Sequence, residues 1–394
     1  MKPKPSSWLV VMMACGLAAC GGQTQNATAN KSASSEPASA STSAGPALSK
    51  TDQLNIYNWS DYVDPNTVTE FEKNNGVKIR QDFYDSNEIL EAKVLTGKSG
   101  YDLVFPSLSN LGRQIKAGAY QKLDKSKIGN YQNIDPILLK LLQQVDPNND
   151  YAVPYFWGFY TVGINPDKVK KALGTDQLPD NAWDLVFKPE YAQKLKSCGI
   201  SFLDSPTSVF PLALSYIGKD PNSNNPDDLK AAAAMMEQVV PNVSRFNSSG
   251  YINDFAQGNL CVGIGYNGDF NIANARAQAA KNGVTVVALV PKQGVGVWID
   301  TVVVTKDAKN VDNALKYINW TLEPKVAAQN GNLVNYAPGT NKAKEFMKPE
   351  IVDNDSIFPS EEALKNSFVN TEKQPDTVKL GVRLWQQIKA KSNR

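Results

Sequence analysis

Short segments that combine aromatic residues with an aspartate recur along the sequence. They are Asn58-Trp59-Ser60-Asp61-Tyr62, Gly265-Tyr266-Asn267-Gly268-Asp269 and Trp298-Ile299-Asp300, and a fourth segment, Pro106-Ser107-Leu108-Ser109, offers hydroxyl groups. Aromatic faces attract alkylammonium ions by about 0.5–2 kcal/mol each when partly desolvated, and a carboxylate supplies the charge-assisted hydrogen bond that an ammonium group requires. Gathered in one cleft, these segments would form an elongated aromatic box with acidic ends, which suits an aliphatic diamine. Taken singly, each Trp or Tyr is more often a packing residue, and each Asp a helix cap or surface residue.

The chain of 394 residues contains no histidine. The commonest general base and metal ligand near neutral pH is therefore missing, and Ser-His-Asp or Cys-His catalysis is impossible. The phosphate-binding pattern GxxxxGK[ST] is also absent. We expect no cofactor, no metal and no catalytic residue. Two alternatives stay open: a hydrolase that uses two carboxylates, such as a glycosidase, and a surface-exposed interaction protein.

The elements that must position these segments alternate between strands and helices. Strands are expected at 54–59, 77–84, 101–105, 160–164, 199–203, 261–265, 284–290 and 301–305. Helices are expected from Pro65 to Gly76, after Ser86, and at 231–240, 271–281 and 310–322. This order predicts an α/β fold with a largely parallel sheet. The length of the chain suggests two lobes, with the ligand cleft between them at the carboxyl ends of strands.

The first fifty residues do not follow this alternation. Lys2 and Lys4 precede a short apolar run, and small residues follow it, as in a secretory signal. The segment Leu17-Ala18-Ala19-Cys20 resembles the bacterial lipobox, which implies cleavage after residue 19 and acylation of Cys20. The polar, Ser- and Ala-rich residues 20–50 are expected to form a disordered tether, spanning on the order of 30 Å. Because Gly21 is not an aspartate, the resemblance leaves sorting to the inner or the outer membrane open.

Export affects how the cysteines and charges are interpreted. Cys198 and Cys261 remain after Cys15 leaves with the signal and Cys20 is acylated, and an oxidising compartment favours a disulfide between them over two buried thiols. Removing residues 1–19 lowers the Lys and Arg count from 41 to 39, equal to the 39 Asp and Glu. A neutral mature chain argues against binding to nucleic acid or, except through the lipid, to membranes.

From about residue 52 to its end, the sequence resembles the periplasmic polyamine-binding proteins of ABC transporters, especially the putrescine-binding branch. Besides Asn58-Trp59-Ser60-Asp61-Tyr62, five segments carry the resemblance: Tyr84-Asp85-Ser86-Asn87-Glu88, Leu123-Asp124-Lys125-Ser126-Lys127, Leu195-Lys196-Ser197-Cys198-Gly199, Ser201-Phe202-Leu203-Asp204 and Tyr251-Ile252-Asn253-Asp254. Such proteins are two-lobed, type II solute-binding proteins. The resemblance therefore implies one lobe from residues 52–155 and 297–345, and a second from 156–296 and 346–394.

The same resemblance implies the ligand-binding residues. They are Trp59, Ser60, Asp61, Tyr62, Ser107, Tyr266, Asp269, Trp298, Asp300 and Tyr336. The sequence departs from the family twice. Tyr266 stands where a Trp is usual, and the segment Ser205-Pro206-Thr207-Ser208 lacks the acidic residue that holds one ligand amine in the family, while the nearby Asp204 is not its usual counterpart.

The function implied is capture of putrescine, spermidine or a related alkyl amine by closure of the lobes on it. The closed protein would deliver the amine to a membrane permease powered by separate ATPase subunits, with the binding protein acting as a periplasmic, lipid-anchored monomer. Because the segment 205–208 lacks the acidic residue of the family, the resemblance does not specify which polyamine is preferred.

Overall fold

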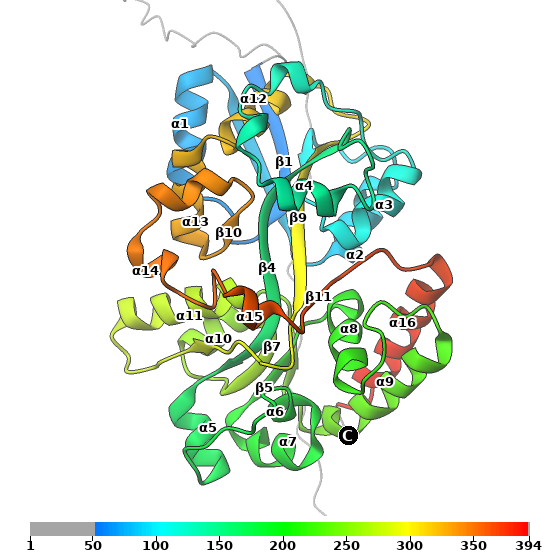
Figure 1. Ribbon diagram of the computed structural model, residues 1–394, viewed down its shortest axis with the longest axis vertical. Coiled ribbons are helices and arrows are strands. Elements are labelled where there is room, and N and C mark those ends of the chain that lie inside the picture. Colours follow the sequence, from blue (N-terminus) through cyan, green and yellow to red (C-terminus); the bar gives the residue numbers. More distant parts are fainter. Residues whose placement is uncertain (1–51, 393–394) are drawn as a thin grey trace, which may run out of the picture. The chain divides into compact units, whose positions relative to one another are not determined.

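The structure of the protein is a computed structural model in which residues 52–392 are described (Figure 1). The proposed signal, the lipidation site Cys20 and the tether lie outside the described residues. The strands are β1 (Gln53–Trp59), β2 (Lys78–Tyr84), β3 (Leu103–Val104), β4 (Ala152–Ile164), β5 (Ile200–Phe202), β6 (Arg245–Phe246), β7 (Val262–Tyr266), β8 (Val287–Ala288), β9 (Gly296–Val304), β10 (Ala337–Pro338) and β11 (Phe368–Val369).

The α-helices cover this sheet and the ends of its strands (Figure 1). They are α1 (Pro65–Asn75), α2 (Asn87–Val94), α3 (Leu108–Lys116), α4 (Pro136–Leu142), α5 (Pro166–Leu173), α6 (Asp184–Phe187), α7 (Pro189–Leu195), α8 (Pro206–Tyr216), α9 (Pro226–Val239), α10 (Tyr251–Ala256), α11 (Asn267–Ala280), α12 (Val311–Thr321), α13 (Pro324–Val334), α14 (Pro349–Val352), α15 (Glu361–Leu364) and α16 (Pro375–Lys389). None of the described helices combines the length and apolar character needed to span a bilayer.

The first helices begin and end where the sequence predicts. The Asp64 side chain accepts a hydrogen bond from the Asn66 backbone nitrogen at 2.8 Å and caps α1, and Pro65 occupies its first turn, where no N–H is needed. Gly76 ends the helix with a φ of 64°, a left-handed conformation that costs glycine little. The Ser86 hydroxyl likewise caps α2 through the Ile89 nitrogen at 3.3 Å.

The sheet has the strand order β2-β1-β3-β9-β4-β7-β5-β6. At its two ends the pairs are parallel, as predicted: β1 with β2 and β3, and β5 with β6 and β7. In the middle the prediction is wrong, because β4 runs antiparallel to β7 and β9, and β9 antiparallel to β3. The reason is that the chain leaves the first lobe along β4 and returns along β9, so these two strands must point in opposite directions.

The two lobes share the long strands β4 and β9, which lie side by side and pass from one to the other (Figure 1). The first lobe contains β1, β2 and β3 with α1, α2, α3, α12 and α13, and the second contains β5, β6 and β7 with α5 to α11 and α16. Met347, Ile351 and Ile357 pack with Ala327 and Ala328 of α13 in one apolar cluster. These contacts associate the residues just after 345 with the first lobe.

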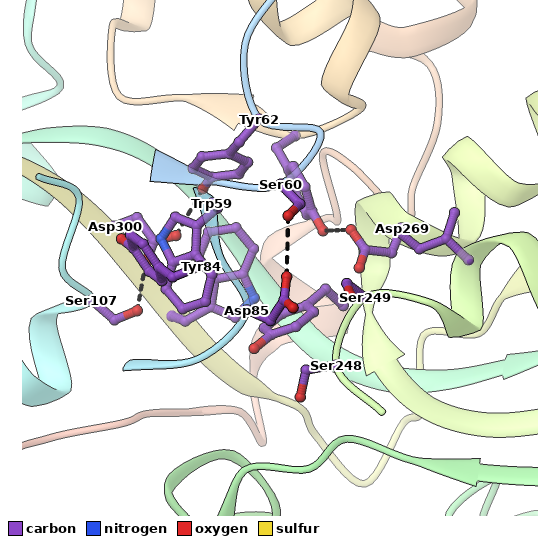
Figure 2. Close-up of a pocket in the computed structure, with 14 residues that line it drawn as sticks. Trp59, Ser60, Tyr62, Tyr84, Asp85, Ser107, Ser248, Ser249, Asp269 and Asp300 are labelled. Carbon is purple, nitrogen blue, oxygen red and sulfur yellow. Dashed lines mark hydrogen bonds between the residues drawn. The ribbon is translucent and has the colours of Figure 1, made fainter. Parts of the chain in front are cut away.

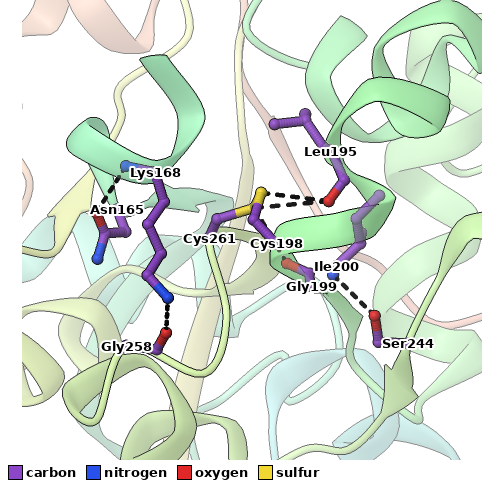
Figure 3. Close-up of a disulfide and its surroundings, with 9 residues drawn as sticks. All are labelled: Asn165, Lys168, Leu195, Cys198, Gly199, Ile200, Ser244, Gly258 and Cys261. Atoms are coloured by element: carbon purple, nitrogen blue, oxygen red, sulfur yellow. Dashed lines mark hydrogen bonds between the residues drawn. A yellow bond between two sulfur atoms is a disulfide. The ribbon is translucent and has the colours of Figure 1, made fainter. Parts of the chain in front are cut away.

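The second lobe contains the predicted disulfide. Cys198, just before β5, is bonded to Cys261, just before β7, with 5.5 Å between their Cα atoms (Figure 3). Cys261 is fully buried. The two cysteines are separated by 63 positions in the sequence, and their bridge joins the starts of two neighbouring parallel strands. The prediction of a disulfide is confirmed.

Candidate functional site

A partly open cavity lies where the first lobe meets the second. Its walls come from both lobes and from the crossing strand β9 (Figure 2). The lining residues are Trp59, Ser60, Tyr62, Tyr84, Asp85, Ser107, Ser248, Ser249, Ile252, Tyr266, Asp269, Trp298, Asp300 and Tyr336. Nine of the ten binding residues expected from the sequence are among them.

Asp61 is the expected residue that the structure places elsewhere. Its backbone has a φ of 55°, a left-handed conformation that Asp tolerates and that turns the chain sharply after β1. Its side chain is 48% exposed, and its Oδ1 lies 2.9 Å from an Arg276 guanidinium nitrogen on α11. Asp61 therefore forms an ion pair between the lobes instead of lining the cavity.

Asp300 forms the acidic group on the β9 side of the cavity. It is 5% exposed, and its carboxylate accepts hydrogen bonds from the Ser107 hydroxyl and, at 2.9 Å, from the Tyr62 hydroxyl. Burial raises the pKa of Asp300 to about 7, although both hydrogen bonds favour the charged form and act in the opposite direction. Contrary to the sequence prediction, Trp298 and Asp300 lie inside β9 and not at a strand end.

Asp269 forms the acidic group on the opposite side, in the first turn of α11. It accepts hydrogen bonds from the Tyr251 hydroxyl at 2.7 Å and from the Tyr336 hydroxyl. Burial raises the pKa of Asp269 to about 6, while the two tyrosine hydroxyls lower it. Tyr336 belongs to the first lobe and Asp269 to the second, so this hydrogen bond also crosses between the lobes.

Aromatic rings form most of the remaining wall. Trp298 packs edge-on against Tyr336 and Tyr266, with ring centroids 5.0 Å and 6.0 Å apart, and Tyr62 lies edge-on to Tyr336 at 5.7 Å. The hydroxyl of Tyr84 and the indole nitrogen of Trp59 are both hydrogen-bonded to the backbone oxygen of Phe105, and the two rings pack against each other with centroids 4.6 Å apart at the cavity wall. Such a box of rings attracts cations.

Sequence reasoning missed five lining residues. Asp85 accepts a hydrogen bond from the Ser60 hydroxyl at 3.1 Å, and Tyr84 precedes it at the end of β2 (Figure 2). Tyr84-Asp85 follows the same pattern of an aromatic residue and an aspartate at a strand end, so a signal was available. Ser248, Ser249 and Ile252 lie in and after the connection between β6 and α10, and no pattern in the sequence distinguishes them.

The chemistry available to this cavity is recognition of a cation. Two carboxylates, one buried and one partly buried, are held by hydroxyl groups, aromatic side chains line the same cavity, and no Lys or Arg lines the wall. Within residues 52–392, no group of three or more Cys, Asp or Glu side chains is placed to hold a metal ion. A ligand with an apolar stem and ammonium groups would satisfy the rings and the carboxylates together.

Comparison with known proteins shows the same architecture. The model of the bacterial extracellular solute-binding protein family matches residues 66–360. The putrescine-binding periplasmic protein SpuD of Pseudomonas aeruginosa is 48% identical over 86% of this chain and 92% of its own length. The putrescine-binding periplasmic protein PotF of Escherichia coli is 44% identical over 86% of this chain and 91% of its own length.

Solved structures agree with these sequence relatives. The TpPotD lipoprotein of Treponema pallidum has a TM-score of 0.71 and 27% identity, over 86% of this chain and 100% of that one. The spermidine/putrescine ABC transporter substrate-binding protein PotD of Streptococcus pneumoniae has a TM-score of 0.69 and 28% identity, over 86% of this chain and 99% of that one. The chain therefore belongs to the family of bacterial extracellular solute-binding proteins.

Proposed function

We propose that this protein captures a polyamine in the periplasm and delivers it to an ABC permease. The observation that carries the proposal is the pair of carboxylates in one aromatic cavity between two lobes, Asp300, which is buried, and Asp269, which is partly buried. Relatives with 48% and 44% identity are named for binding putrescine, which supports the same ligand class here. The protein acts by binding and carries out no reaction.

Each side chain has a role that follows from its contacts. Asp269 and Asp300 accept hydrogen bonds from the ligand ammonium groups, and Trp59, Tyr62, Tyr266, Trp298 and Tyr336 enclose the methylene chain. Ser60 and Ser107 provide hydroxyl groups at the wall. The buried indole nitrogen of Trp298 has no hydrogen-bond partner among the described residues, so it can donate to a water molecule in the cavity.

Binding would close the lobes about β4 and β9. Asp61 pairs with Arg276, and Tyr336 with Asp269, only when the lobes are together. Closure is then favoured by the additional contacts that a ligand makes with both sides. We assign residues 52–155 and 297–345 to one lobe and 156–296 and 346–394 to the other, with the packing of Ile351 and Ile357 on α13 favouring a boundary somewhat later than 345.

The protein would act as a monomer held by a lipid on Cys20, beside a permease with separate ATPase subunits. The supporting sequence feature is Leu17-Ala18-Ala19-Cys20 followed by the polar tether of residues 20–50. A similar solved structure, from Treponema pallidum, is described as a lipoprotein. Mass spectrometry of the protein from its host membrane should detect an acylated N-terminal Cys20, and an unmodified soluble N-terminus would contradict the anchor.

Isothermal titration calorimetry tests the ligand class. The domain without residues 1–50 is freed of carried-over ligand by unfolding and refolding, then titrated with putrescine, cadaverine, spermidine, spermine and arginine. We expect saturable binding of at least one polyamine and little or none of arginine. No measurable binding of any polyamine would refute the proposal, and turnover of a glycoside would favour a hydrolase instead.

A further inference from the structure

The acidic side chain that the second lobe lacks at 205–208 is supplied by the first lobe. Glu88 lies in the first turn of α2, and its Oε1 accepts a hydrogen bond from the Thr207 hydroxyl at 2.8 Å. The Ser205 hydroxyl lies 3.4 Å from the same oxygen. Ser205 precedes α8 of the second lobe and Thr207 lies in its first turn. The Glu88 carboxylate therefore contacts the segment 205–208, which has hydroxyl groups but no acidic side chain.

No positively charged side chain of the described residues pairs with the Glu88 carboxylate. Its second oxygen, Oε2, is buried and has no hydrogen-bond partner among the described residues. Within residues 52–392, no Lys or Arg forms an ion pair with Glu88, whereas Asp204 is already bound to Lys389 at 2.8 Å and to the Trp385 indole nitrogen. A buried carboxylate oxygen without a partner is costly unless a cation binds it.

A second unpartnered group lies in the same interior. Asn370 follows β11, its backbone nitrogen donates to the Val297 oxygen of β9, and its side chain is 4% exposed. Neither its amide oxygen nor its amide nitrogen has a hydrogen-bond partner in the described part of the chain. Burial raises the pKa of the Tyr160 hydroxyl, the charge of Glu88 raises it further, and the Asn370 side chain lowers it.

This polar interior adjoins the cavity, although Glu88 does not line the cavity itself. Asn87, the neighbour of Glu88, donates to the hydroxyl of the lining residue Ser107 at 2.9 Å, and Ser107 in turn donates to Asp300. Tyr160 packs against the lining residue Tyr266 with ring centroids 5.3 Å apart; burial raises its pKa, and the charges of Asp300 and Glu88 raise it further. The two carboxylates therefore act on one region on the Asp300 side of the cavity.

We propose that Glu88, reaching across the lobe interface to Ser205 and Thr207, is the counter-charge for the second ammonium group of a diamine. The inference rests on the proposed function. If Glu88 has this role, it is the residue that discriminates a diamine from a monoamine of the same length. Because Glu88 and Thr207 belong to different lobes, this discrimination is coupled to closure of the lobes.

The test compares putrescine with 4-amino-1-butanol, which has the same chain length and a single ammonium group, by calorimetry. Glu88→Gln keeps a hydrogen-bond acceptor for Thr207 but removes the charge. We expect it to weaken putrescine binding about tenfold or more, as for loss of a charged hydrogen bond, and 4-amino-1-butanol binding by less than about threefold. Glu70→Gln, which removes the same charge from an exposed position on α1, should change neither affinity.

Thr207→Val distinguishes binding of the ligand ammonium group by Glu88 from a purely structural role of the hydrogen bond between Thr207 and Glu88. It removes the hydroxyl that Glu88 contacts but keeps the carboxylate, so the ratio of the two affinities should stay near that of the wild type. An equal loss for both ligands in Glu88→Gln, or no loss for putrescine, would overturn the role of Glu88 while leaving polyamine capture intact. Failure of the wild type to bind any polyamine would instead overturn the proposed function itself.

Discussion

The Asp300 carboxyl group lies almost wholly out of solvent, so it is costly to ionise until a cation arrives, although two accepted hydrogen bonds favour its charged form. Replacing Asp300 with Ala removes the carboxylate that lines the cavity on the β9 side, and we expect polyamine affinity to fall about 10- to 100-fold. Tyr62→Phe removes one of the two hydroxyl groups that hold Asp300 and should cost a few-fold. Equal, small losses in the two variants, measured by calorimetry, would place Asp300 outside the ligand site.

The raised pKa values of Asp269, about 6, and Asp300, about 7, make binding depend on pH. An ammonium group favours the ionised carboxylates, so binding should release protons between about pH 5.5 and 7, and affinity should increase as the pH rises through this range. Titrations at pH 6.5 in buffers of different ionisation enthalpy measure the release. It should decrease in Asp300→Asn, and proton uptake on binding would contradict the assignment.

The same two carboxyl groups affect the unliganded protein. Because their pKa values are higher in the folded chain than in the unfolded chain, the folded state retains protons that the unfolded state has lost. Their contribution to the free energy of unfolding is therefore greatest below about pH 4 and decreases as the pH rises through 6 and 7. Denaturation of the wild type and of Asp300→Asn from pH 5 to 8 isolates this effect. The free energy of unfolding of the wild type, relative to that of the variant, should decrease as the pH rises, and an increase would exclude the effect.

At the scale of single elements, the disulfide restrains the two parallel strands β5 and β7. Bridging residues separated by 63 positions reduces the entropy of the unfolded chain. Its loss in a Cys198→Ser, Cys261→Ser double variant should cost about 2–4 kcal/mol of stability, and lower Tm by about 3–6 °C. Polyamine affinity should stay within a few-fold, because neither cysteine lines the cavity. Two free thiols in the native oxidised protein, measured by thiol titration, would contradict the bridge.

Local signals predict local elements well in this chain. Asp64, Pro65 and Gly76 define α1 because capping, a first-turn proline and a left-handed glycine each act within a few residues. Strands β1, β2 and β7 follow from short apolar patterns in the same way. Two of the expected site residues, Trp59 and Tyr266, end β1 and β7, but the expected set as a whole came from the resemblance to polyamine-binding proteins and not from these local signals.

Features that depend on distant residues could not be predicted in this way. The antiparallel direction of β4 and β9 follows from the path of the chain between lobes, and it places Asp300 in the middle of a strand. The pairing of Asp61 with Arg276 links residues on different lobes, so nothing near Asp61 in the sequence indicates that it leaves the cavity. The contact of Glu88 with Thr207 has the same character, since 119 positions separate the two residues.

At the scale of the whole molecule, the contacts between lobes describe a closed form. Ion pairing of Asp61 with Arg276 and the hydrogen bond from Tyr336 to Asp269 both connect the lobes. Without ligand, the buried carboxylates oppose closure, and we expect small-angle X-ray scattering to show a smaller radius of gyration on addition of putrescine. Arg276→Ala, which removes a partly exposed ion pair, should reduce affinity by only a few-fold. An unchanged radius at saturating ligand would argue against closure.

A crystal structure of residues 51–394 with putrescine tests the central claim most directly. The account predicts a linear ligand in the cavity, with its methylene groups between the rings of Trp59, Trp298 and Tyr336. One ammonium nitrogen should lie within hydrogen-bond distance of Asp269, and the other on the side of Asp300 and Glu88. A ligand bound outside this cavity, or an empty cavity in crystals grown at saturating putrescine, would contradict the account.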